Sequence, residues 1–500
     1  MTLTAAGVIT RILGFVYRIY MSNLMGAEGM GLYQLIMPVY TLAWSIACAG
    51  FNTTVSKLTA QERAKGEFGN MTQMLKQSVL ITTGLGVILT AVLYFCAEFL
   101  SVHFFGDART VLPLKILSFA FPFMAAGTCI RGYFIGLQEA KIPAANQVLE
   151  QIVRMIVIYF IAAAFVPRGL EYAAAAALIA IVAEEIFSFL FVFVAYKRHK
   201  RKCRVIFKKP NISASQSLAL IFAMALPLTG NRVAGSLLSA WENVLIPRRL
   251  QMFGLPAAEA ISEFGRIQGM AIPLIFFPTA VLTALSVTIV PAVSEAAAAK
   301  DMKGISSISS KALLFSAITG MGAASLFLFF AHELGIAIYN QPIGLMLQLL
   351  GIMCPFIYMQ IILSGVLNGL GCQMFIFRNS LLSSGISIAF IFLLVPHFGI
   401  PAYIFGWLVS LVVVIALGLR RIRCYMPLEM HFSRWLLRPL AAAAIAGLIA
   451  RFLADRFLFE FAGIRVGLVL AISILAAIYL AGILLSGSIS REEVTRLFSK

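Results

Sequence analysis

Residues 171–204 read EYAAAAALIAIVAEEIFSFLFVFVAYKRHKRKCR. The apolar part, residues 171–196, is longer than the ~20 residues that a helix needs to cross the hydrocarbon core of a bilayer. The basic run after Tyr196 is too costly to place inside that core, so it marks where the chain leaves the membrane. The pattern therefore predicts a transmembrane helix that ends in a basic loop.

The same pattern recurs along the whole chain of 500 residues. Hydrophobic residues make up 61% of it, charged residues 12%, and the mean hydropathy is +0.94, whereas soluble domains are about 45–50% apolar and about 25% charged. This small number of polar residues cannot cover the surface of a soluble protein of this size. We therefore expect an all-α polytopic membrane protein. Apolar windows predict fourteen spans. They lie at 4–24, 30–55, 76–99, 111–136, 143–166, 171–196, 214–246, 261–292, 308–332, 343–369, 374–396, 400–419, 435–455 and 464–486.

Lysine and arginine are distributed unevenly among the loops between these spans. The net charge is +18, and with the N-terminus in the cytoplasm the even-numbered loops and the C-terminus hold 25 basic residues, against seven in the odd-numbered loops. This bias is typical of a multi-pass protein of the bacterial cytoplasmic membrane with both termini in the cytoplasm. It favours anionic lipid over nucleic acid as the partner of the basic linker 197–213.

The two halves of the chain repeat. A shift of 233 residues aligns two short motifs of the first half with the second half. The aligned motifs are Pro122-Phe123 with Pro355-Phe356, and Gly132-xxx-Gly136 with Gly365-xxx-Gly369. The glycine pairs are typical of close helix contacts in membranes. Six spans in each half keep the halves in the same orientation, which predicts a parallel repeat about an axis along the membrane normal.

The expected architecture is two six-helix bundles around a central cavity, with two extra helices at the C-terminus. This plan is typical of an alternating-access transporter. The predicted segments are an N-terminal bundle at 1–196, the basic cytoplasmic linker at 197–213, a C-terminal bundle at 214–420, and two further transmembrane helices with a cytoplasmic tail at 421–500.

Motifs for metal binding and catalysis are missing from the sequence. The seven cysteines form no CxxC pair, and the five histidines are scattered. The chain has no HExxH, GxxxxGK[ST], GxSxG or DxD motif. We therefore expect no metal, no cofactor and no enzymatic activity.

Four arginines inside or at the edge of the predicted spans are candidates for substrate binding. Arg11 and Arg18 lie seven residues apart on nearly one face of the first span, Arg232 lies in the seventh, and Arg266 in the eighth. A charge at that depth needs water or a partner, and the guanidinium fork suits phosphate. Because spans one and seven, and two and eight, correspond across the repeat, we expect an anion-binding cavity. The alternative is that Arg232 pairs with Glu242 and that Arg11 extends to the membrane interface.

Acidic residues inside the spans are candidates for ion coupling. Glu184 and Glu185 are adjacent in the sixth span, and Glu242 lies in the seventh. Glu150 and Arg154 in the fifth span have the i,i+4 spacing of a helical ion pair, so we expect them to pair with each other.

Several motifs resemble the polysaccharide-flippase branch of the multidrug, oligosaccharidyl-lipid and polysaccharide exporter superfamily. They are Arg11-Ile-Leu-Gly-Phe15, Gly26-Ala-Glu-Gly-Met-Gly-Leu-Tyr33 and Pro291-Ala-Val-Ser-Glu295. Two more, Glu242-Asn-Val-Leu-Ile-Pro247 and Gly269-Met-Ala-Ile-Pro273, resemble the stage V sporulation protein B group within it. The resemblance covers nearly the whole chain.

This resemblance implies a flippase of polyprenyl-linked sugars or peptidoglycan precursors. In the related lipid II flippases, arginines on spans one and eight bind the diphosphate, and by motif position Arg11 and Arg266 match them. The last two spans would offer a groove for the lipid tail. The chain departs from that pattern twice, because Val16-Tyr17 precede Arg18 where the family has one residue, and Gly265 replaces an acidic residue.

The sequence thus predicts a flippase that moves a polyprenyl-(di)phosphate-linked glycan or a lipid II-like peptidoglycan precursor by alternating access, for cell-wall, spore-cortex or polysaccharide synthesis. Two alternatives stay open. One is a cation-coupled multidrug exporter of the same fold, and the other is a non-transporting membrane scaffold that recruits cell-wall synthases.

Overall fold

The computed structural model describes residues 2–202, 210–425 and 433–488, and every regular element in these ranges is helical. The helices to residue 265 are α1 (Thr2–Trp44), α2 (Gly50–Ala64), α3 (Phe68–Phe99), α4 (Val111–Ser118), α5 (Phe121–Gly136), α6 (Lys141–Phe165), α7 (Leu170–Lys202), α8 (Ala214–Met252) and α9 (Ala257–Gly265). Those that follow are α10 (Ile272–Phe276), α11 (Thr279–Ala298), α12 (Met302–Phe329), α13 (Ala331–Leu334), α14 (Gly344–Gly369), α15 (Gln373–Leu393), α16 (Val395–Phe398), α17 (Ile400–Arg423), α18 (Arg438–Leu453) and α19 (Phe459–Leu485). The expected all-α fold is confirmed.

Short turns of tighter or wider helix join these elements. The π-helical turns are η1 (Ser45–Ala49), η2 (Leu100–Phe105), η5 (Arg266–Ala271), η6 (Gly335–Tyr339), η7 (Ser433–Leu437) and η8 (Ala454–Leu458). The 3₁₀ turns are η3 (Ala108–Thr110) and η4 (Val166–Arg168).

Within the described ranges, eleven helical runs are long and apolar enough to cross a membrane, or twelve when α4 and α5, bent by 45°, count as one span. Two of these runs contain a break at a glycine with positive φ, Gly26 in α1 (φ 68°) and Gly463 in α19 (φ 69°). Glycine adopts this conformation at little cost because it has no Cβ. Each of the two runs covers two predicted spans, and the number fourteen stays a prediction.

The predicted span at 261–292 is more broken than the sequence indicates. It consists of the end of α9, the turn η5, the short helix α10 and most of α11. Pro273 lies in the first turn of α10, and Pro278 immediately precedes α11. Proline has no backbone N–H to donate and restricts the residue before it, so both prolines favour a new helix start over a continuous helix.

Packing divides the chain into two units, residues 1–248 with 256–265, and residues 249–255 with 266–500. Helix α8 belongs mainly to the first unit, where a Cβ added at Gly50 of α2 would meet Ala225 and Thr229 of α8. The division predicted at 197–213 follows the internal repeat, and the repeat-based segments stay a prediction.

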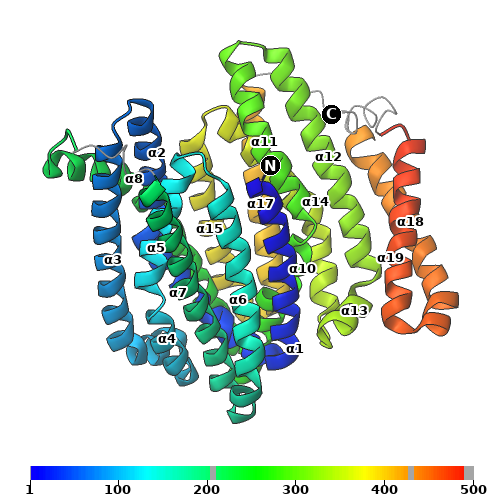
Figure 1. Cartoon of the computed structure of the whole chain (residues 1–500). Coiled ribbons are helices and arrows are strands. Elements are labelled where there is room, and N and C mark those ends of the chain that lie inside the picture. Colours follow the sequence, from blue (N-terminus) through cyan, green and yellow to red (C-terminus); the bar gives the residue numbers. More distant parts are fainter. Residues whose placement is uncertain (1, 203–209, 426–432, 489–500) are drawn as a thin grey trace. The chain divides into compact units, whose positions relative to one another are not determined.

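The long helices of the first unit run side by side, and their loops gather at two ends (Figure 1). At one end the Asn211 side chain donates to Glu67 (2.6 Å), so that the linker meets the α2–α3 loop. At the other end Arg109, before α4, pairs with Glu28 of α1 (2.7 Å). Each of these two contacts joins loops that the span assignment places on the same side of the membrane.

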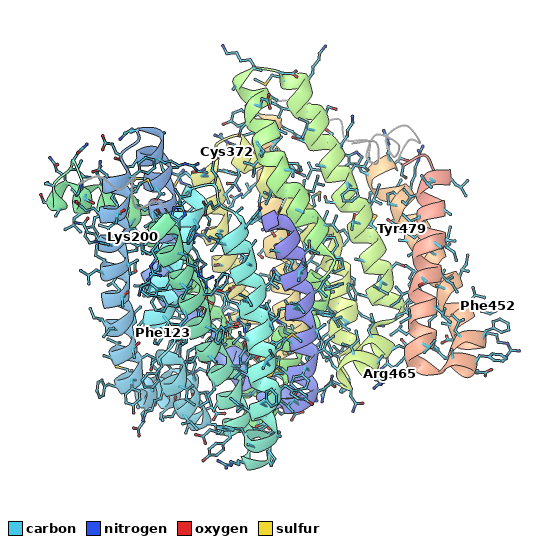
Figure 2. All side chains as sticks on the ribbon, in the orientation of Figure 1. Phe123, Lys200, Cys372, Phe452, Arg465 and Tyr479 are labelled. Carbon is cyan, nitrogen blue, oxygen red and sulfur yellow. The ribbon has the colours of Figure 1, made fainter. Side chains whose placement is uncertain are left out.

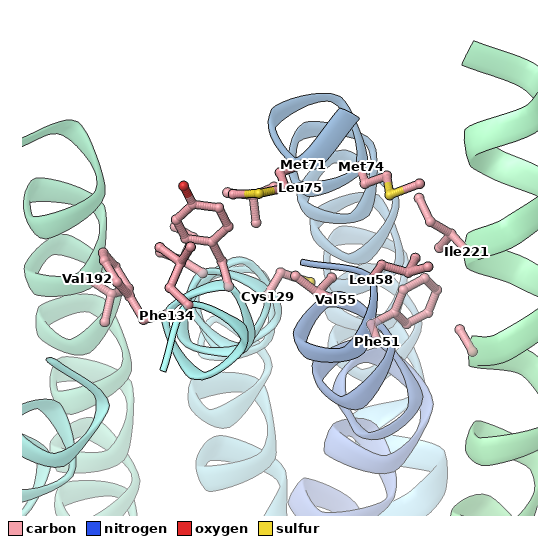
Figure 3. Close-up of a cluster of buried hydrophobic side chains, with 14 residues drawn as sticks. Phe51, Val55, Leu58, Met71, Met74, Leu75, Cys129, Phe134, Val192 and Ile221 are labelled. Carbon is pink, nitrogen blue, oxygen red and sulfur yellow. The ribbon is translucent and has the colours of Figure 1, made fainter. Parts of the chain in front are cut away.

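A cluster of buried apolar side chains joins five helices of the first unit (Figure 3). Its members are Phe51, Val55, Leu58, Met71, Met74, Leu75, Cys129, Ile130, Tyr133, Phe134, Leu137, Val192, Ile221 and Ala225. Helices associate in lipid through close packing of this kind, because lipid tails are as apolar as the side chains and provide no hydrophobic drive between helices. The cluster packs α5 against α2, α3 and α7 and extends to α8 through Ile221 and Ala225.

The same helix contact recurs in the second unit. A Cβ added at Gly86 of α3 would come within 2.8 Å of Pro122 Cα in α5, and one at Gly320 of α12 would come within 2.5 Å of Pro355 Cα in α14. The two prolines are the pair that the internal repeat aligns. Corresponding helices therefore touch at corresponding residues in both units.

The repeated glycine pairs are close helix contacts, as predicted. A Cβ at Gly132 would lie 2.7 Å from the carbonyl oxygen of Asn52, and one at Gly365 would lie 3.0 Å from that of Ser286. Small residues at these places let the backbones of neighbouring helices touch.

Large apolar side chains cover the outside of the helices. Phe95, Phe160 and Phe461 are 81%, 73% and 89% exposed, and Phe452 projects from the edge of the α18–α19 hairpin (Figure 2). A water-facing surface of this kind is unfavourable, whereas a lipid-facing one is not. The chain is a multi-pass membrane protein.

The glycine contact predicts a pair of opposite stability effects. Gly132→Ala should lower the free energy of unfolding by about 1–3 kcal/mol, because its Cβ would overlap the Asn52 carbonyl. Gly84→Ala in α3, where a Cβ meets nothing within 4 Å, should leave it unchanged or raise it by about 0.5–1 kcal/mol. Thermal unfolding of the detergent-purified variants measures both. Equal stability of the two variants would contradict the contact.

Candidate functional site: a charge network inside the first unit

Charged and polar side chains from four helices meet inside the first unit. They are Tyr40 of α1, Thr128 and Arg131 of α5, Asn146, Glu150 and Arg154 of α6, and Glu184, Glu185 and Ser188 of α7. The first turns of α7 are a run of buried alanines, 173–177, whose small side chains let neighbouring helices approach. This approach leaves Glu184 and Glu185 only 2% and 6% exposed.

Arg131 and Glu150 form the first ion pair of the network. Arg131 Nη1 lies 2.5 Å from Glu150 Oε1, and the same oxygen accepts from Asn146 Nδ2 (2.7 Å) and from Ser188 Oγ (2.6 Å). Arg131 Nη2 donates to Thr128 Oγ1 (2.8 Å). An ion pair removed from water is stable only when additional hydrogen bonds satisfy its remaining groups, and here three helices provide them.

Arg154 and Glu184 form the second ion pair. The Nε and Nη2 groups of Arg154 donate to the two carboxylate oxygens of Glu184, a bidentate arrangement. The same guanidinium lies over the ring of Tyr17, 5.5 Å from its centroid. Both charges are thus held in a fixed geometry between α1, α6 and α7.

Glu185 has a different environment from its neighbour. Its Oε1 accepts a hydrogen bond from Tyr40 Oη (2.5 Å), and its buried Oε2 has no hydrogen-bond partner in the described part of the chain. Among the described residues, no arginine, lysine or histidine nitrogen lies within ion-pair distance of this carboxyl group.

The expectation that Glu150 and Arg154 pair with each other is wrong. Glu150 pairs with Arg131 of α5, and Arg154 with Glu184 of α7. The i,i+4 rule describes an isolated helix surface. In the bundle, partners on adjacent helices give each group more hydrogen bonds than its neighbour on α6 would, because Glu150 also gains Asn146 and Ser188.

Three of the predicted substrate-binding arginines belong to the first unit and are exposed: Arg11 and Arg18 in α1, and Arg232 in α8. In the described part of the chain, the Arg18 and Arg232 guanidiniums make no hydrogen bond or ion pair. The alternative in which Arg232 pairs with Glu242 is therefore not formed. Arg266 is half-buried in turn η5 of the second unit.

Arg18 is next in the chain to a residue that contacts the charge network. Tyr17 precedes it in α1, and the Tyr17 ring lies 5.5 Å from the Arg154 guanidinium. The third coupling candidate, Glu242, is half-buried in α8.

Sequence reasoning missed Arg131, Tyr40 and Ser188 as members of the site. Arg131 carried a usable signal, because a charged residue within a span needs a partner. Tyr40 and Ser188 carried none, because hydroxyl groups are common in membrane helices and their partners come from distant parts of the chain. Within the described ranges, no group of three or more histidine, cysteine, aspartate or glutamate side chains has an arrangement that could hold a metal ion.

Gly265, which replaces the acidic residue of related flippases, has a packing reason. Helix α9 lies so close to α1 that a Cβ on Gly265 would come within 2.6 Å of the Gly31 nitrogen, and one on Gly31 within 2.6 Å of Ile261 Cγ2. An acidic side chain does not fit at this contact. The charge next to Arg266 in the sequence is therefore absent for a steric reason.

The sequence pattern of a known family, described as polysaccharide biosynthesis protein, matches residues 1–252. Over 501 aligned residues the chain is 30% identical to stage V sporulation protein B of Bacillus subtilis (strain 168). The alignment covers 99% of this chain and 96% of that protein. The chain belongs to the polysaccharide biosynthesis protein family. This family is the one that the sequence motifs resemble, so that prediction is confirmed.

Other similarities extend this placement. This family member is 27% identical over 365 residues to the lipid II flippase MurJ of Bacillus subtilis (strain 168), covering 68% of this chain and 63% of that protein. Its fold matches a solved lipid II flippase MurJ in an inward closed conformation, with a TM-score of 0.71, 13% identity, and 96% and 97% of the two chains covered. It also matches an inward-facing multidrug resistance MATE family transporter, with a TM-score of 0.66, 14% identity, and 85% and 96% covered. The predicted transporter fold is confirmed.

The bidentate pair predicts that single substitutions destabilise this family member strongly. Arg154→Met leaves Glu184 buried without its counter-charge and should cost about 3–5 kcal/mol of unfolding free energy. The double variant Arg154→Met with Glu184→Met should recover most of that loss, because apolar side chains of similar volume replace both charges.

Thermal unfolding in detergent tests this pair. The exposed Arg168→Ala, in the turn between α6 and α7, serves as the control and should change the stability by less than about 0.5 kcal/mol. A double variant as unstable as Arg154→Met alone would show that the pair is not the cause.

Proposed function

We propose that this chain is a flippase of the bacterial cytoplasmic membrane, with both termini in the cytoplasm. Its substrate is a polyprenyl-(di)phosphate-linked glycan or peptidoglycan precursor, which it moves from the inner to the outer leaflet by alternating access. It changes no covalent bond and uses no cofactor. The proposal is supported by the full-length similarity to stage V sporulation protein B and by the fold shared with a lipid II flippase.

The observation that carries the proposal is the state of Arg18 and Arg232. Both guanidiniums are exposed on membrane helices and make no hydrogen bond or ion pair with described residues. A lone cation in the bilayer is unfavourable unless it meets water or an anion. A phosphate group on a lipid provides that anion with the matching fork geometry.

Arg11 and Arg266 complete the proposed binding set, because their motif positions match the arginines that bind diphosphate in related flippases. Among the acidic residues, Glu184, Glu185 and Glu242 are the proposed candidates for coupling transport to an ion. The chain moves negative charge outward, so an interior-negative membrane potential should favour export by about 2.3 kcal/mol per charge per 100 mV.

The cytoplasmic end of α6 and α7 is the proposed contact with anionic lipid. His199 lies 3.7 Å from Glu139 there, at a cavity of about 390 Å³. The lining residues are Glu139, Ile142, Phe191, Val194, Ala195, Arg198 and His199. A basic residue above apolar walls suits an anionic headgroup with its acyl chains. Cell-wall synthases, which consume such precursors, are the proposed protein partners.

Flipping of a labelled lipid tests the function and the site together. The purified protein is placed in liposomes with a labelled undecaprenyl-diphosphate sugar, and a membrane-impermeant enzyme reports the label that reaches the outer leaflet. Arg18→Ala and Arg232→Ala should each lower the initial rate about 10- to 100-fold, since each removes charge-assisted hydrogen bonds worth about 1.5–3 kcal/mol. Arg168→Ala, away from these helix faces, should flip at the wild-type rate.

Three outcomes would reject parts of the proposal. Wild-type flipping in the double variant Arg18→Ala with Arg232→Ala would reject the binding site. Failure of the wild type to flip any such lipid under an imposed membrane potential or ion gradient, together with efflux of drug dyes from the same liposomes, would favour a multidrug exporter. Failure of both activities would favour a scaffold.

A further inference from the structure

The charge network of the first unit is unbalanced. It contains three carboxyl groups, Glu150, Glu184 and Glu185, and two guanidiniums, Arg131 and Arg154. Each arginine is committed to one partner, Arg131 to Glu150 and Arg154 to Glu184. With every group ionised, the network would therefore hold one uncompensated negative charge.

The surplus charge falls on Glu185. The residue is only 6% exposed. Among the described residues, Tyr40 is the one donor to its Oε1, and its Oε2 has no hydrogen-bond partner. An isolated ionised carboxylate in such a site is far more costly than a neutral one, because it loses its hydration without gaining a counter-charge. The favourable solution in the packed arrangement is a proton on Glu185.

The other charged groups on the helices around α7 do not compensate Glu185. Arg131 of α5 and Arg154 of α6 attract a negative charge on Glu185, but only from beyond ion-pair distance. Glu150 of α6 and Glu184 of α7 are like charges and repel it. Cys48 of η1 is buried and interacts electrostatically with Glu185, but its thiol carries no positive charge. The charged residues on the other elements that pack against α7 have partners of their own. Lys115 of α4 lies over the Tyr94 ring, Arg109 of η3 pairs with Asp107 and Glu28, and Arg168 of η4 lies over the Phe165 ring.

We propose that Glu185 is a proton-binding site that couples this transporter to the proton gradient. The carboxyl group holds one proton on Oε2 while α1 and α7 are packed as in this structure. It releases that proton to water when the Tyr40 contact opens and the oxygens become hydrated, and it takes one proton back on closing. For its role in transport, the inference rests on the proposed flippase function.

Helix α1 connects this site to the substrate. It carries Tyr40 on one side of the Gly26 break and Arg18 on the other. A movement of α1 at this break therefore acts both on the Tyr40–Glu185 contact and on the part of the helix that carries Arg18.

Infrared difference spectroscopy detects the proton directly. The wild-type protein in lipid nanodiscs should show a carboxylic-acid C=O stretching band that is lost on raising the pH within about pH 5–9, the range in which buried carboxyl groups titrate. The band should vanish in Glu185→Gln and remain in Glu98→Gln, an exposed carboxyl at the end of α3. An unchanged band in Glu185→Gln would overturn the proposal.

A second variant keeps the test valid if Glu185→Gln fails to fold. Tyr40→Phe removes the hydroxyl that donates to Glu185 and stabilises its ionised form. The band should then persist to a pH about one unit higher, because a lost hydrogen bond to the charged form favours the neutral one. A titration at the wild-type pH in Tyr40→Phe would overturn the proposal as well.

The pH dependence of flipping separates this proposal from the proposed function. A wild-type flipping rate that varies with pH, and a flat rate in Glu185→Gln, would support proton coupling. Flipping with the same pH profile in both proteins, or flipping that follows sodium concentration at constant pH, would overturn the proton site and leave the flippase intact. A band that titrates in a protein with no flipping activity would uphold the proton site and overturn the proposed function.

Discussion

A charge inside a bilayer needs a partner, and this requirement organises the first unit of the protein. Arg131 and Arg154 each lie within a membrane helix, and each is neutralised by a carboxylate from another helix, Glu150 and Glu184. Neither pair is stable unless α5, α6 and α7 hold their positions, because a displaced partner leaves a buried charge uncompensated. The network therefore fixes how these helices pack, and it also ties their packing to the protonation of the remaining carboxyl group, Glu185.

Small residues make this arrangement sterically feasible. The buried alanines 173–177 at the start of α7, and glycines such as Gly132 in α5, bring helix backbones within contact distance. At that distance short hydroxyl side chains such as Ser188 reach across to a neighbouring helix. Close packing of small residues also excludes larger side chains. The contact of Gly265 with Gly31 leaves no space for a carboxylate beside Arg266. Close packing and charge placement are thus set by the same residues.

The first unit separates two kinds of charged residue. The paired charges of α5, α6 and α7 are largely buried, whereas Arg18 and Arg232 are exposed and make no ion pair with described residues. The buried groups stabilise the bundle, and the exposed ones are those proposed to bind the anionic substrate. Tyr17 adjoins both sets, because it precedes Arg18 in α1 and the Arg154 guanidinium lies over its ring, 5.5 Å from the centroid.

The sequence determined the features that depend on local composition and on short spacing. Apolar length and the distribution of basic residues predicted a multi-pass helical membrane protein, because the cost of placing backbone and charge in lipid depends on each segment alone. The glycine pairs predicted the close helix contacts that occur in both units. The motifs of α1 and α8 predicted the family, which the full-length similarity confirms.

The tertiary structure alone decided which charged groups are partners. The spacing of Glu150 and Arg154 on α6 favoured a pair that does not form, because Arg131 and Glu184 reach them from other helices and bring further hydrogen bonds. The distinct states of Glu184 and Glu185 were equally hidden, since adjacent residues on a helix point about 100° apart and meet different neighbours. Which neighbour each one meets depends on helices more than a hundred residues away in the case of Tyr40, and no local pattern encodes it.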